Sequence, residues 1–164
     1  GIKVDIDMRD SYNVPSKSPA DTADWPVELV KASIASGTES TRWEAFGDVY
    51  TLIFNTIAEA DTKPVALHCT YGADRTGIAS FFLEALLGMS KEDIRRDYVW
   101  TKFTQGRDPN PNGELQKWIE KTEKNYEGAS FADKMEQHLM TKGLSKATLE
   151  HIREIFIPGY VAKA

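Results

Sequence analysis

The sequence predicts an α/β fold in which a small central sheet is flanked by helices. Two strand-like segments, residues 2–8 and 65–68, are separated by a helical pattern, and several helical patterns follow the second one. Two strands alone make a poor sheet, so we expect further strands to precede residue 1. Residues 1–164 are therefore interpreted as a single domain that is the C-terminal portion of a longer one.

Composition narrows the possible functions. The chain has 164 residues, of which 41% are hydrophobic and 27% charged, as is usual for a folded domain with one core. The net charge of −5 argues against nucleic acid or an anionic membrane as a partner. No apolar run is long enough to span a bilayer, and no secretion signal is visible, so the compartment stays open. The single Cys excludes an internal disulfide framework and a zinc site built on several thiolates.

The first half of the chain leads up to the second strand. Residues 2–8 alternate apolar and polar side chains, the period of a half-buried strand. Residues 13–24 are rich in Pro, Ser and Thr and are predicted to be loop, and Trp25–Ala32 shows a weak helical pattern. Thr41 and Glu44 have the capping-box spacing and predict a helix start. The apolar face of that helix comprises Phe46, Val49, Tyr50, Ile53, Phe54 and Ile57.

The second half is predicted to be helical. Residues 78–87 are nearly all apolar, which predicts a helix buried on most sides and ended by Gly88. Ser90 and Asp93 form a second capping-box pair, which opens a helix that runs to about Phe103.

Residues 105–113 are predicted to be loop, and two further helices, 115–126 and 131–140, follow, the second closing at Gly143. Ser145 is expected to cap the last helix, whose apolar face comprises Leu149, Ile152, Ile155 and Phe156. Two histidines on these helices, His138 and His151, are expected at the surface or partly packed.

The stretch between the second strand and the apolar helix carries the chemistry. Five residues separate Cys69 from Arg75, and the thiol lies in a tight loop just before a helix. A helix N-terminus presents unpaired N–H groups and a partial positive charge, so it attracts anions and favours a thiolate. The planar guanidinium of Arg75 suits the oxygens of a phosphate.

Each residue of this loop has an expected role. Cys69 would attack phosphorus, and Arg75 would bind two phosphate oxygens and stabilise charge in the transition state. The Thr76 hydroxyl would bond the sulfur and help it leave, while His68 would orient the loop. Gly77 would permit close helix packing. Phosphate would be bound by Thr70, Tyr71, Gly72, Ala73, Asp74 and Arg75, mostly through backbone N–H groups.

A second interpretation of Cys69 is a small buried hydrophobic residue, which is common for a free cysteine. The neighbouring residues argue against it, because a packing Cys has no need of Gly72, Arg75 and Gly77 at these spacings.

The string His-Cys-x2-Gly-x-Asp-Arg-Thr-Gly resembles the signature loop of the cysteine-dependent protein tyrosine and dual-specificity phosphatase superfamily. Its Ala-Asp-Arg-Thr-Gly ending is most similar to the bacterial tyrosine-protein phosphatase branch. Residues 2–9 look like the Asp-Leu-Arg strand of that branch, residues 82–98 like its post-loop helices and residues 143–157 like its closing helix. Residues 13–41 have no such counterpart.

This resemblance implies a protein tyrosine phosphatase-like fold that uses no cofactor and no metal. It implies a phosphorylated protein or small phosphoester as substrate. Strands and a helix normally precede the Asp-Leu-Arg strand, so an N-terminal segment of the same protein would complete the sheet.

The general acid is the least obvious part of the pattern. Classical members place an Asp after a Trp-Pro pair, but here Val27 follows Trp25 and Pro26. Nearby carboxylates are Asp24, Glu39 and, on a predicted helix face, Asp48. The resembling branch is thought to use the Asp of the loop, which is Asp74 here. The alternative is that Asp74 only pairs with Arg75 or another base.

Asp7 and Arg9 end the first strand at the carboxyl edge where α/β sites form, so they either line the pocket or form a strand-end salt bridge. Tyr71 could stack on an aryl ring or pack inward.

The leading hypothesis is hydrolysis of phosphotyrosine, with phosphoserine and phosphothreonine as further substrates, through a cysteinyl-phosphate intermediate. Inositol phosphates and phosphoinositides come second, because the loop lacks an added Lys or Arg. A catalytically silent phosphate-binding module is another alternative. A rhodanese-like sulfur transferase also uses a Cys loop, but the Arg-Thr-Gly ending argues against it.

Overall fold

A parallel sheet forms the centre of the molecule in the computed structural model, which describes residues 1–10, 18–34, 47–100 and 113–162. Within these ranges three strands pair in the order β2–β1–β3, namely β1 (Val4–Asp7), β2 (Glu28–Lys31) and β3 (Val65–His68). The register places Asp7 of β1 between Lys31 of β2 and His68 of β3. The predicted α/β class is confirmed; whether further strands precede residue 1 stays a prediction.

Strand β2 corrects the sequence prediction, which gave Trp25–Ala32 a helical pattern. Residues 28–31 pair in parallel with β1 instead, and three of the four are exposed. A four-residue edge strand is too short for its period to be distinguished from that of a helix. Its backbone pairing with β1, which is remote in sequence, decides the conformation.

Strand β1 also differs from the prediction, because it is buried on both faces rather than half-buried. All four residues are buried, including the side chains of Asp5 and Asp7. Buried carboxylates are tolerated when charged or hydrogen-bonding partners compensate them, and both aspartates have such partners. Asp5 and Asp7, the polar residues of this alternating strand, therefore face other polar groups inside the protein instead of solvent.

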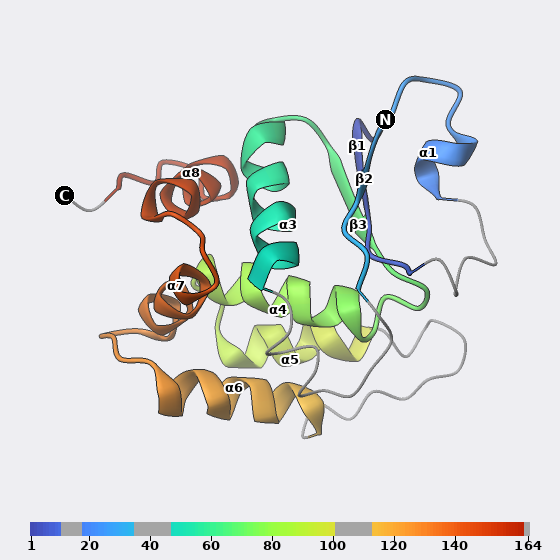
Figure 1. Cartoon of the computed structure of the whole chain (residues 1–164). Coiled ribbons are helices and arrows are strands. Elements are labelled where there is room, and N and C mark those ends of the chain that lie inside the picture. The colour runs from blue at the N-terminus through green and yellow to red at the C-terminus, as the bar shows by residue number, and fades with distance from the viewer. Residues whose placement is uncertain (11–17, 35–46, 101–112, 163–164) are drawn as a thin grey trace.

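Helices cover the sheet on both sides, with α1 and α3 on opposite faces (Figure 1). Residues 19–22 form the short helix α1 inside the predicted loop, where Asp21 bonds the backbone N–H of Ser18 at 2.8 Å and so closes a capping box. The other described helices are α3 (Gly47–Ala60), α4 (Arg75–Leu86), α5 (Lys91–Trp100), α6 (Glu114–Asn125), α7 (Phe131–Thr141) and α8 (Lys146–Phe156).

The predicted helices of the second half are confirmed, with small shifts of their ends. Helix α4 begins three residues earlier than predicted, at Arg75, and Gly88 follows it at φ +81°. Ser90 and Ser145 cap α5 and α8 as expected, through hydrogen bonds from Asp93 N and Thr148 N. The predicted cap at residues 41–44, the apolar position 46, and residues 101–112 lie outside the described residues.

Aromatic side chains fill the core between α3, α4 and the C-terminal helices. The ring centroids of Tyr50 and Phe82 are 4.8 Å apart, and those of Phe81 and Trp118 are 5.9 Å apart. Two predictions for the last helices were wrong: His138 is fully buried, and Phe156 is 46% exposed. His138 tolerates burial because its Nδ1 lies 2.8 Å from the Tyr126 hydroxyl and its ring packs against Phe82.

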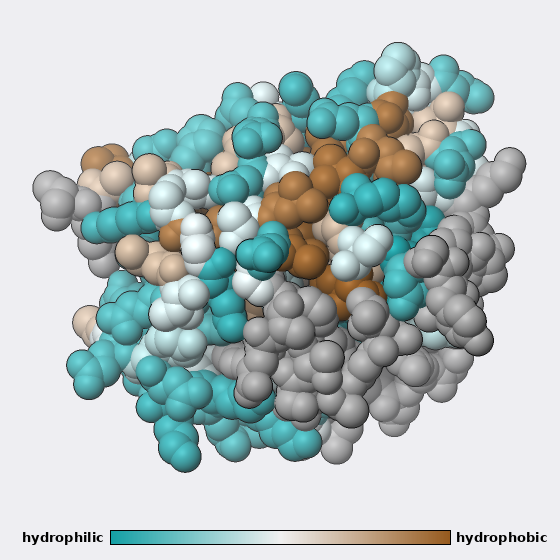
Figure 2. Space-filling model, in the orientation of Figure 1, coloured by the Kyte–Doolittle hydropathy of each residue, from teal (hydrophilic) through white to brown (hydrophobic). Residues whose placement is uncertain are grey.

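Figure 2 shows hydrophobic surface between α3 and the strands on the face drawn. Three residues of the outer strands, Val30, Val65 and Leu67, are only partly buried while they pack against the core. The core is thus incompletely covered by the described residues on this side. Among the described residues, none of the helices is both long and apolar enough to cross a membrane.

Candidate active site

The Cys–Arg loop lies at the carboxyl edge of the sheet, between β3 and α4. The hydrogen-bond ladder between β1 and β3 continues as far as His68, the residue before Cys69, because Met8 N donates to His68 O at 2.9 Å. Gly72 turns the loop with φ +74°, a conformation that side-chain-bearing residues rarely adopt. The chain then enters α4, whose first turn is closed by Ile78 N donating to Asp74 O at 3.0 Å. The thiol is therefore held at a helix N-terminus, as the sequence predicts.

Cys69 is 8% exposed, and its surroundings favour the thiolate. Burial raises the pKa of the thiol, but hydrogen bonds from the Thr76 hydroxyl and from backbone N–H groups of the loop outweigh it. The net pKa of Cys69 is lowered from its ordinary value. This is the environment of a reactive rather than a packing cysteine.

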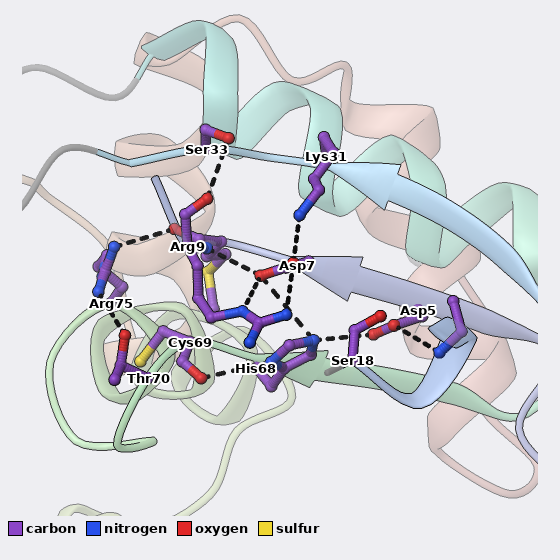
Figure 3. A network of polar contacts seen from close by, with 12 residues as sticks. Asp5, Asp7, Arg9, Ser18, Lys31, Ser33, His68, Cys69, Thr70 and Arg75 are labelled. Carbon is purple, nitrogen blue, oxygen red and sulfur yellow. Dashed lines mark hydrogen bonds and ion pairs between the residues drawn. The ribbon is translucent and has the colours of Figure 1, made fainter. Parts of the chain in front are cut away.

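Arg75 is buried to 7% exposure and tied to the ends of two strands. Its Nη1 donates to Met8 O at 3.2 Å and to Ile34 O at 2.9 Å, just beyond β1 and β2. Its Nη2 donates to Thr70 Oγ1 at 3.1 Å, across the loop (Figure 3). The guanidinium is thus fixed next to the loop by backbone carbonyls, which carry no full charge that could compete with an anion.

The remaining loop residues differ in exposure. Tyr71 is 37% exposed, and Ala73 is buried. Asp74 is the N-cap residue of α4 and is partly exposed, directly before Arg75. A Cβ on Gly77 would lie 3.3 Å from Cε2 of Tyr98, so the glycine allows α5 to approach the loop closely.

A charged layer lies beneath the loop on one face of the sheet. Asp7 accepts hydrogen bonds from Arg9 Nε at 2.8 Å and Nη2 at 2.9 Å, and it also binds Lys31 Nζ (Figure 3). Burial raises the pKa of Asp7, but the bonds from Arg9 and Lys31 outweigh it and hold the pKa well below its usual range. The salt bridge that the sequence left as one alternative for Asp7 and Arg9 is therefore formed.

Other contacts of the site were not anticipated from the sequence. The carbonyls of Met8 and Ile34 come from backbone whose position depends on strand pairing, so no residue type marks them. Lys31 was missed because β2 was missed. Asp5 was assigned to the solvent side of a half-buried strand. The sequence did carry a signal, because charged residues occur in or next to three segments that become neighbouring strands. Only the register of the sheet shows that these residues lie together.

A small cavity of about 30 Å³ lies behind the loop, with Gly72 and Gly77 on one side and Glu84 and Asp97 on the other. Burial, followed by the hydrogen bond and negative charge of Asp97, raises the pKa of Glu84 to about 8. At neutral pH Glu84 is therefore mostly protonated, which avoids like-charge repulsion between α4 and α5.

The geometry agrees with the comparison with known families. A family model described as the tyrosine phosphatase family matches residues 1–164. No curated protein matches the chain at a significant level. The match spans the strand, loop and helix that hold Cys69 and Arg75, together with the helices that support them. The chain therefore belongs to the tyrosine phosphatase family, and it is a phosphatase that acts on a phosphorylated substrate.

Proposed function

We propose that the chain hydrolyses phosphomonoesters, phosphotyrosine above all and phosphoserine or phosphothreonine in addition, through a phosphate ester of Cys69. The observation that carries the proposal is the buried thiol at the N-terminus of α4, whose pKa is lowered by Thr76 and the loop N–H groups. A thiolate is the nucleophile that this reaction needs, and a ring of N–H donors suits the phosphate oxygens.

In the first step, Cys69 Sγ attacks phosphorus while the bond from phosphorus to the ester oxygen breaks. Arg75 binds two equatorial oxygens of the transferring group and stabilises their charge, while Asp74 gives its proton to the leaving oxygen. In the second step a water attacks phosphorus and loses a proton to Asp74. The sulfur–phosphorus bond then breaks, inorganic phosphate leaves, and the Thr76 hydroxyl stabilises the departing thiolate.

Loop composition favours an aryl phosphate on a protein over a highly phosphorylated lipid headgroup. The loop offers one cation, Arg75, and its central positions are Ala73 and Asp74, so a second or third phosphate would find no added charge there. Tyr71, 37% exposed, offers a ring surface on which a phosphotyrosine side chain could stack. Both features support phosphotyrosine over phosphoinositides as the substrate.

The test is hydrolysis of p-nitrophenyl phosphate in a chelator, with Cys69→Ser and Arg75→Ala compared with wild type. We expect Cys69→Ser to be inactive and Arg75→Ala to lose at least about 10²-fold in kcat/KM. Arg96→Ala is the matched control, because this arginine lies 69% exposed on α5. An inactive wild type, or a Cys69→Ser variant that retains turnover, would refute the proposal. Binding of tungstate without turnover would instead support a silent phosphate-binding module.

The role of Asp74 is tested separately with Asp74→Asn. We expect this variant to lose turnover most strongly on alkyl phosphates, whose leaving oxygen needs a proton, while binding of an aryl phosphate is kept. Asp48→Asn, which changes an exposed carboxylate of α3, is the control. Unchanged kinetics of Asp74→Asn on both substrate classes would remove Asp74 from the mechanism.

A further inference from the structure

Asp5 is a fully buried carboxylate of β1, two residues before Asp7, which belongs to the charged layer at the strand ends. Its Oδ2 accepts a hydrogen bond from Ala20 N of α1 at 3.1 Å. Its Oδ1 lies 3.0 Å from Nε2 of His68, across the β1–β3 pair. Neither Asp5 Oδ1 nor His68 Nε2 forms a hydrogen bond among the described residues, so this 3.0 Å approach is the contact that holds the two side chains together.

The other ring nitrogen of His68 faces the catalytic loop. Nδ1 lies 3.3 Å from the carbonyl oxygen of Cys69, and Figure 3 shows the imidazole between this carbonyl and Asp5. Both neighbours of the ring accept hydrogen bonds. The ring is therefore held between an acceptor of the catalytic loop and a carboxylate of β1.

The other carboxylates near His68 have charged partners of their own, so Asp5 is the carboxylate that contacts its imidazole most closely. Asp7 Oδ1 is also near His68 Nε2, at 3.9 Å, but Asp7 already binds Arg9 and Lys31. From α1, Asp21 faces the same cations, Arg9 and Lys31. The contact between Asp5 Oδ1 and His68 Nε2 is shorter, at 3.0 Å.

We propose that Asp5 is a positioning residue of the catalytic loop, acting through His68. Asp5 holds the imidazole in one orientation, the imidazole holds the Cys69 carbonyl, and the thiol keeps its place at the N-terminus of α4. The catalytic meaning of this assignment rests on the proposed function, but its effect on the thiol does not.

The test is the rate of alkylation by iodoacetamide, which reports the thiolate directly because Cys69 is the single cysteine of the chain. Asp5→Asn keeps the side-chain shape and an acceptor for Ala20 N while it removes the charge. At pH 6 we expect it to react about tenfold more slowly than wild type, the scale of a coupling between groups in contact. Asp48→Asn is the control for a lost carboxylate and should react at the wild-type rate.

A double-mutant cycle separates positioning through His68 from a general structural effect. His68→Asn keeps a donor where Nδ1 lies but loses the contact with Asp5, so we expect it to slow alkylation as Asp5→Asn does. Adding Asp5→Asn to it should cause no further loss. Effects that multiply, or an Asp5→Asn variant that reacts at the wild-type rate, would overturn the proposal.

Two further arms keep the inference testable. Should Asp5→Asn not fold, His68→Asn alone decides, because a wild-type alkylation rate in that variant means that the contact with Asp5 is without effect. Alkylation needs no phosphoester hydrolysis. A wild type that fails the p-nitrophenyl phosphate assay yet shows the expected alkylation cycle would refute the proposed function and support the positioning role.

Discussion

Acidification is expected to destabilise this protein through His138, which lies in the core between Phe82 and Tyr126. Burial, with a smaller contribution from the positive charge of Lys142, lowers the pKa of His138 from 6.5 to about 3. The unfolded chain therefore binds a proton at this position more readily than the folded one. The stability that His138 provides in its neutral form is fully present above pH 6.5 and is lost as the pH falls toward 3.

The size of the effect follows from the two pKa values. Between pH 7.5 and pH 5.0 the folded state stays neutral at His138, while the unfolded state passes 1.5 pH units below its midpoint. At about 1.4 kcal/mol per unit, the free energy of unfolding falls by about 2 kcal/mol from this residue alone. For a chain of this size that corresponds to a drop of roughly 4–8 °C in melting temperature.

The assay is urea unfolding at the two pH values for wild type, His138→Gln and His151→Gln. His151 is exposed on α8, so its replacement should leave the pH dependence unchanged. His138→Gln should be less stable than wild type at pH 7.5 because packing is lost, but it should lose about 2 kcal/mol less on going to pH 5.0. Equal losses in wild type and His138→Gln would mean that His138 is not held neutral, and the reasoning would fail.

Three further predictions concern the loop and its support. Because the pKa of Glu84 is raised from 4.5 to about 8 by burial and its carboxylate neighbour, the contribution of this residue to stability should fall as the pH rises from about 4.5 to 8, opposite in sign to that of His138. Urea unfolding of Glu84→Gln should lack this loss, which is on the order of 1 kcal/mol after solvent screening; the same pH dependence in the variant and in wild type would contradict a proton held on Glu84. Gly72→Ala and Gly88→Ala, both at positive φ with no atom within 4 Å of the new Cβ, should each lose about 1 kcal/mol of unfolding free energy. Only the first should also lose phosphatase activity, and equal activity in both would show that the loop tolerates the strain. Thr76→Val should raise the pKa of the loop thiol, seen as slower alkylation at pH 6, and a wild-type rate would exclude a hydroxyl bond to sulfur.

The parts of the structure that follow from local pattern could be predicted from the sequence. The strand at residues 65–68, the loop at Cys69 and the helix after it are defined by neighbouring residues, and the structure places all three as expected. The caps of α5 and α8 depend on residues three apart, so Ser90 and Ser145 were also identifiable. The loop chemistry could be read because its residue types and spacings lie within ten positions.

Features that depend on pairing of distant segments could not be predicted in this way. The four residues of β2 have no distinctive period, and their conformation is set by hydrogen bonds to β1. The anchoring of Arg75 on Ile34 O joins residues 41 positions apart through backbone atoms, which no side chain identifies. The burial of Asp5 and His138 reflects compensating partners, such as His68 for Asp5, and polar residue type alone predicted the opposite.

The hydrogen bond from Arg75 to Ile34 O also connects the segment after the exposed edge strand β2 to the charged guanidinium beside the loop. Strand β2 has few buried side chains, so its position depends heavily on its backbone contacts. An oxyanion that immobilises the guanidinium also restrains Ile34 O, three residues beyond the last residue of this strand. Ligand occupancy and the ordering of β2 are thereby thermodynamically linked, so each stabilises the other by the same free energy. The edge strand β2 therefore contributes to the affinity of the site for phosphate, although it does not contact the phosphate.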